Sequence, residues 1–204
     1  MDSLTWDKGA GLVPAIVQHA RTRRVLMLGW MDRAALEATL ATGRVTFFSR
    51  SRGRRWMKGE TSGNVLDFRS LQADCDRDAL LVQALPRGPT CHTGTASCFA
   101  GSPDAFLAVL DDLVAARERT RPPGSYTARL FDGGVRAIAQ KVGEEGVETA
   151  LAAVAQDDAA LLGEAADLLF HLTVLLRARG LGLADAEAVL RARHADGPAP
   201  APRA

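Results

Sequence analysis

The hydrophobic pattern of this 204-residue chain changes at Gly101, Ser102 and Pro103. Before this point short apolar stretches follow the period of β-strands, and after it apolar residues recur at the period of α-helices. Ser102 and Pro103 also form a favourable N-cap and first-turn pair for the first helix. The pattern predicts an α+β chain with a strand-rich domain over residues 1–103 and an all-helical domain over residues 104–204.

Turn and cap residues divide each predicted domain into elements. In the first domain we expect a helix that Asp32 caps and Gly43 ends, and strands at residues 11–19, 25–30, 45–49, 66–73 and 79–85. In the second domain we expect helices at residues 104–119, 128–156, 158–179 and 185–194. The Pro- and Ala-rich residues 197–204 are expected to be a disordered tail.

Composition narrows the functional classes. The net charge of +1 argues against a general nucleic-acid binder, and no apolar run is long enough to span a bilayer. The N-terminus lacks the basic and apolar regions of a signal peptide, so we expect a cytoplasmic protein that binds neither nucleic acid nor membrane. Residues 1–104 carry 14 Lys and Arg against 10 Asp and Glu, whereas residues 105–204 carry 11 against 14. An arginine-rich half suits phosphate, and an acidic half suits metal ions.

Two kinds of metal ligand lie close together in the first domain, namely the cysteines Cys75, Cys91 and Cys98 and the aspartates Asp74, Asp76 and Asp78. Thiolates suit zinc, whereas carboxylates suit magnesium. Three protein ligands with one open position are typical of catalytic zinc. The alternative is that the cysteines are buried without a metal, although three aspartates within five residues repel one another unless a cation neutralises them.

A basic, glycine-containing segment follows the third predicted strand. Residues 50–64 hold five basic side chains, three glycines and several hydroxyl groups. Backbone amides, hydroxyl donors and guanidinium groups together suit a phosphorylated small molecule. The alternative is an ordinary solvated basic loop.

The helical domain carries a second acidic constellation. Glu145 and Glu148 lie three residues apart on one predicted helix, and Glu164 and Asp167 lie three apart on the next, with His171 one turn further on. Two antiparallel helices that each present such a pair can surround divalent cations that bridge phosphate oxygens. A solvated acidic face is the alternative, but the apolar residues around these carboxylates favour a metal site.

These motifs resemble two enzyme families. The first half, over residues 11–99, is similar to phosphoribosyl-AMP cyclohydrolase in the motifs Phe48-Ser49-Arg50-Ser51-Arg52, Trp56 with residues 58–64, Asp74-Cys75-Asp76, Cys91-His92-Thr93-Gly94 and Ser97-Cys98-Phe99. The second half, over residues 105–194, is similar to phosphoribosyl-ATP pyrophosphohydrolase in Ser125-Tyr126-Thr127, Lys141-Val142-Gly143-Glu144-Glu145, Glu148, Glu164-Ala165-Ala166-Asp167 and His171. Their order resembles that of the bifunctional enzyme family of histidine biosynthesis.

For the first half, the resemblance implies hydrolytic opening of the adenine ring of phosphoribosyl-AMP between N1 and C6. Zinc would be held by Cys75, Cys91 and Cys98 from both chains of a homodimer, and magnesium by Asp74, Asp76 and Asp78. His92 is the candidate base, or it only orients its loop. Substrate would be bound by Ser49, Arg50, Ser51, Arg52, Trp56, Lys58, Glu60, Thr61 and Ser62.

For the second half, the resemblance implies hydrolysis of phosphoribosyl-ATP to phosphoribosyl-AMP and pyrophosphate. The helices would form a bundle like that of the all-helical nucleotide pyrophosphohydrolases. Magnesium would be held by the acidic side chains on these helices, namely Glu145, Glu148, Glu164 and Asp167. Glu144 would be a further ligand or the base, and Lys141 would meet a phosphate group.

Two other classes of protein remain as alternatives. A zinc-stabilised RNA-binding module would use the arginines of residues 50–55 and would show salt-sensitive binding without turnover. A housecleaning nucleotide pyrophosphatase with a structural zinc-binding first domain would cleave nucleoside triphosphates without opening the purine ring. A panel of nucleotide substrates separates these classes.

Overall fold

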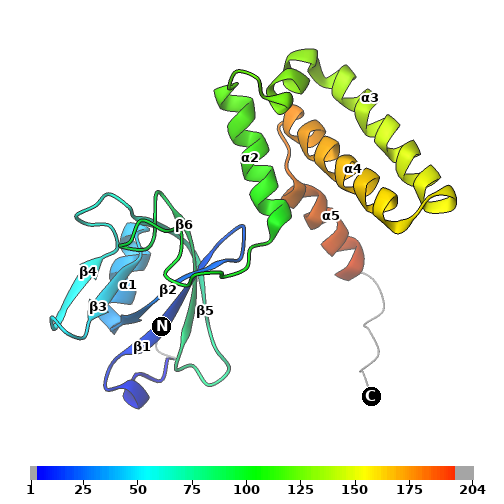
Figure 1. Ribbon diagram of the computed structural model, residues 1–204. Helices are drawn as coiled ribbons and strands as arrows, with labels where there is room; N and C mark the ends of the chain where they lie inside the picture. The colour runs from blue at the N-terminus through cyan, green and yellow to red at the C-terminus, as the bar shows by residue number, and fades with distance from the viewer. Residues whose placement is uncertain (1–3, 196–204) are drawn as a thin grey trace, which may run out of the picture. The chain divides into compact units, whose positions relative to one another are not determined.

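The computed structural model describes residues 4–195 and divides into two compact units, one up to Ala105 and one from Phe106 onward. Within the described residues the first unit holds the β-strands, and the second is built from helices (Figure 1). This arrangement confirms the predicted α+β layout. The predicted tail at residues 197–204 lies outside the described part of the chain.

A four-stranded sheet forms the first unit, in the order β2 (Val25–Met31), β1 (Val13–His19), β6 (Leu80–Pro86) and β5 (Leu66–Ala73). β1 runs antiparallel to β2 and parallel to β6, which pairs antiparallel with β5. The buried core joins this sheet to helix α1 (Arg33–Thr42) and to a hairpin of β3 (Thr46–Ser49) and β4 (Arg54–Met57). A short 3-10 turn, η1 (Trp6–Gly9), precedes β1.

Local signals explain where α1 begins and ends. The Asp32 side chain accepts a hydrogen bond from the Ala35 amide, and Gly43 ends the helix with φ of 67°. Strand β4, by contrast, was not predicted, because its first two residues are exposed arginines and show no alternation of apolar side chains. Its formation depends on pairing with β3, where the rings of Trp56 and Phe47 pack 5.3 Å apart.

The prediction that Ser102 and Pro103 begin the second domain's first helix is wrong, because α2 (Phe106–Thr120) starts later. The Ser102 hydroxyl instead accepts a hydrogen bond from the amide of Val25 on β2, and Asp104 pairs with Arg24. These contacts hold the segment against the sheet, so the Ser102 hydroxyl binds the first unit instead of capping α2.

The second unit packs α2 with α3 (Tyr126–Ala155), α4 (Asp158–Ala178) and α5 (Leu183–Ala195). Two residues join α3 to α4, so these helices lie side by side and antiparallel (Figure 1). α3 contains a break at Gly134, where φ of 76° interrupts the helix. Val114, Phe131, Ile138 and Val174 form the core of this unit.

Candidate active sites

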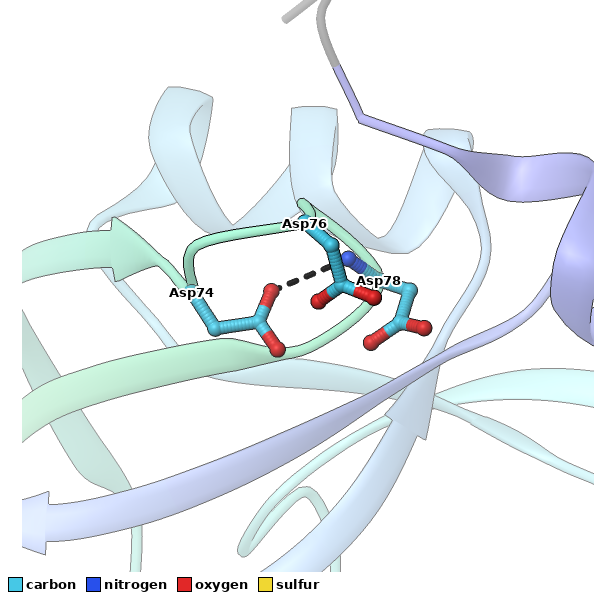
Figure 2. Close-up of side chains that lie close together, drawn as sticks. All are labelled: Asp74, Asp76 and Asp78. Atoms are coloured by element: carbon cyan, nitrogen blue, oxygen red, sulfur yellow. Dashed lines mark hydrogen bonds between the residues drawn. The ribbon is translucent and has the colours of Figure 1, made fainter.

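The three aspartates of the first unit gather in the turn that joins β5 to β6, as Figure 2 shows. Each offers a carboxylate oxygen, and these oxygens lie within 4.8 Å of one another. One oxygen of Asp74 accepts hydrogen bonds of 3.0 Å from the amides of Asp78 and Ala79, which fixes the turn. The turn therefore presents hard oxygen donors of the kind that magnesium prefers.

Lys8 of η1 contacts this cluster. Its ammonium nitrogen lies 2.6 Å from a carboxylate oxygen of Asp76 and 3.1 Å from one of Asp78. The hydrogen bond from Lys8 lowers the pKa of Asp76, and that with Asp76 raises the pKa of Lys8. This contact could not be predicted from local sequence, because Lys8 and Asp76 are 68 residues apart.

Cys91 and Cys98 lie together in the loop that follows β6, around a pocket that His92 and Thr93 also line. The Thr93 hydroxyl donates to the Cys91 sulfur over 3.1 Å, and this hydrogen bond is the main reason that the pKa of Cys91 falls to about 6. Burial, followed by the neighbouring Cys91, raises the pKa of Cys98. Nδ1 of His92 is 3.8 Å from the Cys91 sulfur. Cys91 is therefore a thiolate at neutral pH, which suits it to bind zinc.

Cys75 lies at a different corner of the sheet. Its turn leads into Leu80, which pairs with Ala15 near the start of β1. Cys98 lies near the other end of β1. Its amide donates to the carbonyl of Leu26 on β2, and the neighbouring Val25 pairs with Gln18 near the end of β1. Among the described residues, no cluster of three potential metal ligands includes a cysteine. A single chain therefore brings two of the three predicted zinc ligands together and holds the third apart.

The predicted phosphate-binding residues lie around the β3–β4 hairpin. Ser49, Arg50, Ser51 and Trp56 line one pocket, and Arg52 joins Ser49, Ser51 and Trp56 around another. The Arg50 guanidinium stacks 4.3 Å from the centre of the Trp30 ring. These contacts place guanidinium and hydroxyl donors beside aromatic surface, an arrangement suited to a nucleotide.

The remaining predicted substrate residues follow β4. Burial raises the pKa of Cys98, and Lys58 lies close enough for its charge to oppose part of this rise. Glu60 accepts a 3.1 Å hydrogen bond from the Met57 amide and so closes the turn, in which Thr61 and Ser62 are exposed. Lys58 thus places a positive charge near the cysteine loop.

In the helical unit, Glu145 of α3 meets Glu164 and Asp167 of α4. Carboxylate oxygens from the three residues lie within 4.8 Å of one another, and Glu145 is only 6% exposed. Burial, and then the charges of Glu148, Glu145 and Asp167, raise the pKa of Glu164. Glu148 is exposed and outside the three-residue cluster, but its charge acts on Glu164. Such a concentration of carboxylates is suited to a divalent cation.

Lys141 and Glu144 form an ion pair beside this cluster. Their charged groups are 2.7 Å apart, and the Lys141 nitrogen also lies 4.0 Å from a Glu145 oxygen. Lys141, followed by Gln140, lowers the pKa of Glu144 through hydrogen bonds, and Glu144 raises the pKa of Lys141. The lowered pKa keeps Glu144 in its charged form beside the carboxylate cluster.

Comparisons with known proteins assign a class to each unit. Residues 27–100 match the family model of phosphoribosyl-AMP cyclohydrolase, and residues 107–194 match that of phosphoribosyl-ATP pyrophosphohydrolase. The chain is therefore a hydrolase with two enzyme domains.

Relatives over the whole chain identify the family. The chain is 66% identical over 192 residues to the histidine biosynthesis bifunctional protein HisIE of Xanthomonas axonopodis pv. citri, with 94% of this chain and 93% of the relative covered. It is 54% identical over 193 residues to the HisIE protein of Escherichia coli K12, with 94% and 95% covered. The chain belongs to the HisIE family of bifunctional histidine biosynthesis enzymes, which confirms the predicted resemblance. The match of both domains to these enzyme families argues against the RNA-binding and housecleaning alternatives.

Proposed function

We propose that the helical unit hydrolyses phosphoribosyl-ATP to phosphoribosyl-AMP and pyrophosphate with magnesium, and that the first unit then opens the adenine ring of phosphoribosyl-AMP between N1 and C6 with zinc. The observation that carries this proposal is the presence of a separate cluster of metal-type donors in each matched domain. The product of the helical unit is the substrate of the other, which gives the fusion a metabolic logic.

In the helical unit, Glu145, Glu164 and Asp167 would hold magnesium, with Glu148 beside them. Bound magnesium neutralises phosphate charge and lowers the pKa of water. Lys141 lies at the edge of the carboxylates, where its ammonium group can bind a phosphate oxygen when Glu144 turns to the cation. Water attacks between the α and β phosphates, and the bond between them breaks to release pyrophosphate.

In the first unit, Cys91 and Cys98 would hold zinc, and Asp74, Asp76 and Asp78 would hold magnesium. Bound zinc lowers the pKa of water so that a nucleophile is available at neutral pH. His92 lies next to Cys91 and accepts a proton from the attacking water. Arg50, Arg52 and the hydroxyl groups around the β3–β4 hairpin bind the ribose phosphates.

A homodimer would complete the zinc site. Because one chain holds Cys75 apart from Cys91, zinc would take Cys75 from one subunit and Cys91 and Cys98 from its partner. The helical unit also favours a second copy, since α3 and α4 expose the apolar side chains of Val147, Leu151, Val154 and Leu162.

We place the enzyme in the cytoplasm, where a reducing environment keeps its cysteines available for zinc. The expectation that no apolar run is long enough to span a bilayer is wrong for α4, which among the described residues has the length and composition to do so, with 17% of its most apolar 18-residue stretch buried. One such helix is weak grounds for a membrane span. Glu164 and Asp167 would be costly within a bilayer, so we assign its apolar surface to contact with the second copy.

Metal removal and restoration test the proposal. The purified protein is stripped with a chelator and then receives Mg²⁺, Zn²⁺ or both, while pyrophosphate release and the ultraviolet change of ring opening are followed. We expect Mg²⁺ alone to restore pyrophosphate release from phosphoribosyl-ATP, and ring opening of phosphoribosyl-AMP to require Zn²⁺ as well. Full ring opening in zinc-free protein, or pyrophosphate release without Mg²⁺, would overturn the proposal.

A further inference from the structure

Two residues of the helical unit adjoin the carboxylate cluster without belonging to it. His171 lies on α4, one turn beyond Asp167, and is only 4% exposed. Tyr126 is the first residue of α3, and its hydroxyl oxygen lies 2.9 Å from Nε2 of His171. The two rings meet edge to face, with centres 5.9 Å apart. The pair therefore joins the start of α3 to the middle of α4.

The partners of the imidazole determine which of its nitrogens donates. Nδ1 of His171 lies 2.9 Å from the backbone carbonyl oxygen of Asp167, which can only accept a hydrogen bond. Nδ1 therefore carries a hydrogen, and in the neutral ring Nε2 is left to accept one from the Tyr126 hydroxyl. A chain of donors thus runs from Tyr126 through His171 toward the carboxylate cluster.

The donating nitrogen also faces Glu145. Nδ1 of His171 is 3.4 Å from a carboxylate oxygen of Glu145, closer than the Lys141 nitrogen at 4.0 Å. Glu145 is buried beside two other carboxylates, and a buried carboxylate needs a donor close by. His171 places Nδ1 of its ring against this carboxylate, while its hydrogen bond goes to the backbone carbonyl of Asp167. One ring therefore contacts two of the three clustered residues, on different helices.

We propose that His171 and Tyr126 are positioning residues of the pyrophosphohydrolase site. His171 fixes the Glu145 carboxylate relative to Asp167 before the cation binds, and Tyr126 fixes the orientation of the His171 ring. Packing keeps Tyr126 in place, because its ring stacks on Phe170 with centres 6.0 Å apart and the Arg129 guanidinium lies 5.6 Å from its centre. The inference rests on the proposed function, since it requires that Glu145 binds magnesium.

The test compares variants that keep or remove the Nδ1 donor. His171→Leu removes it, whereas His171→Asn places an amide N–H near the position of Nδ1. We expect His171→Leu to raise the Mg²⁺ concentration for half-maximal pyrophosphate release about tenfold or more, and His171→Asn to recover most of this loss. Tyr126→Phe should have a smaller effect of the same kind, and none when added to His171→Leu.

Calorimetric titration with Mn²⁺ gives a readout that does not depend on turnover. The Mn²⁺ binding step that is absent in Glu145→Gln identifies the site in the helical unit. We expect the same step to be weakened in His171→Leu. Thr173→Val, a buried change on α4 whose hydroxyl bonds within its own helix, is the matched control and should bind Mn²⁺ as wild type does. Ring opening of supplied phosphoribosyl-AMP should be unchanged in all these variants, which shows that the first unit is intact, and an unchanged far-ultraviolet circular dichroism spectrum shows that the helical unit is folded.

The outcomes distinguish the positioning role of His171 from the proposed function of the helical unit. If Glu145→Gln loses Mn²⁺ binding and pyrophosphate release but His171→Leu keeps the wild-type Mg²⁺ dependence, His171 only packs the helices and the present inference fails. If His171→Leu lowers the maximal rate without changing the metal dependence, the inference fails as well. If Glu145→Gln itself keeps both metal binding and turnover, the proposed function of the helical unit is wrong.

Discussion

The ammonium group of Lys8 lies 2.6 Å from a carboxylate oxygen of Asp76, and it also reaches Asp78. Both aspartates belong to the proposed magnesium site of the first unit, so Lys8 and a divalent cation compete for the same oxygens. The 3-10 turn that carries Lys8 is held nearby by a 2.8 Å hydrogen bond from the Thr5 amide to the Arg77 carbonyl. Magnesium binding at the proposed site would therefore displace an internal cation.

Removal of this competitor should strengthen magnesium binding. We expect Lys8→Met to lower the Mg²⁺ concentration for half-maximal ring opening of phosphoribosyl-AMP by about two- to fivefold, the range for an exposed ion pair. Arg69→Met removes the same charge from an exposed position on β5 and serves as the control. An unchanged or higher Mg²⁺ requirement in Lys8→Met would show that Lys8 does not oppose the metal.

The low pKa of Cys91 predicts the pH dependence of its alkylation. In zinc-free protein, the thiolate of Cys91 is present above a pH of about 6 and is lost as the pH falls below that value. Reaction with iodoacetamide, followed by mass spectrometry, should therefore have a midpoint near pH 6 at Cys91 and a higher midpoint at Cys98, whose pKa is raised. Thr93→Val should shift the Cys91 midpoint upward, because it removes the main hydrogen bond to the sulfur. A midpoint that Thr93→Val leaves unchanged would contradict this origin of the low pKa.

The shared zinc site predicts complementation between inactive variants. Cys75→Ser and Cys91→Ser homodimers should each lack ring opening, because every zinc site in them has lost a ligand. After the two proteins are mixed and allowed to exchange subunits, half of the dimers are mixed and each has one intact site, so about a quarter of wild-type activity should return. A mixture of Cys91→Ser with Cys98→Ser is the control and should stay inactive, since both cysteines come from the same chain. Equal recovery in the two mixtures would rule out the proposed sharing.

A buried ion pair should contribute to the stability of the helical unit. Asp111 of α2 is 1% exposed and binds the Arg177 side chain of α4 through two hydrogen bonds, one of them 2.7 Å long. Asp111→Ala leaves the guanidinium without this partner in a partly buried position, so we expect a loss of about 3 kcal/mol in the free energy of unfolding. Glu187→Ala removes an exposed pair with Arg191 and should cost about 0.5 kcal/mol or less. Urea denaturation measures both, and equal losses would contradict the role of burial.

Local chemistry explains which elements could be predicted from the sequence. The caps of α1 act within a few residues, so Asp32 and Gly43 marked its ends correctly. Ser102 carries an equally good cap signal, but its hydroxyl is taken by β2, which is distant in sequence. Strand β4 likewise forms through its pairing with β3 rather than through its own pattern. The errors fall where a partner elsewhere in the chain decides the local structure.

The same difference between local signals and contacts distant in sequence applies to the candidate sites. Helical spacing predicted an acidic pair on each of two facing helices, and the structure brings Glu145 of α3 to Glu164 and Asp167 of α4 but leaves Glu148 outside their cluster. The distance of Cys75 from the cysteine loop depends on strand order and register, which the spacing of the cysteines does not encode. Tyr126 and His171 stood in recognisable motifs, but their contact with each other could be found only in the folded chain.

The proposed division of labour is that each half of the chain carries out one reaction with its own residues. The most direct measurement supplies Cys91→Ala with phosphoribosyl-ATP and Glu145→Ala with phosphoribosyl-AMP, and follows both pyrophosphate and ring opening in each. We predict that Cys91→Ala releases pyrophosphate at the wild-type rate but leaves the ring closed, whereas Glu145→Ala opens the ring at the wild-type rate but releases no pyrophosphate from phosphoribosyl-ATP. Loss of both activities in either variant, with the fold intact by circular dichroism, would show that the two reactions are not divided between the two halves.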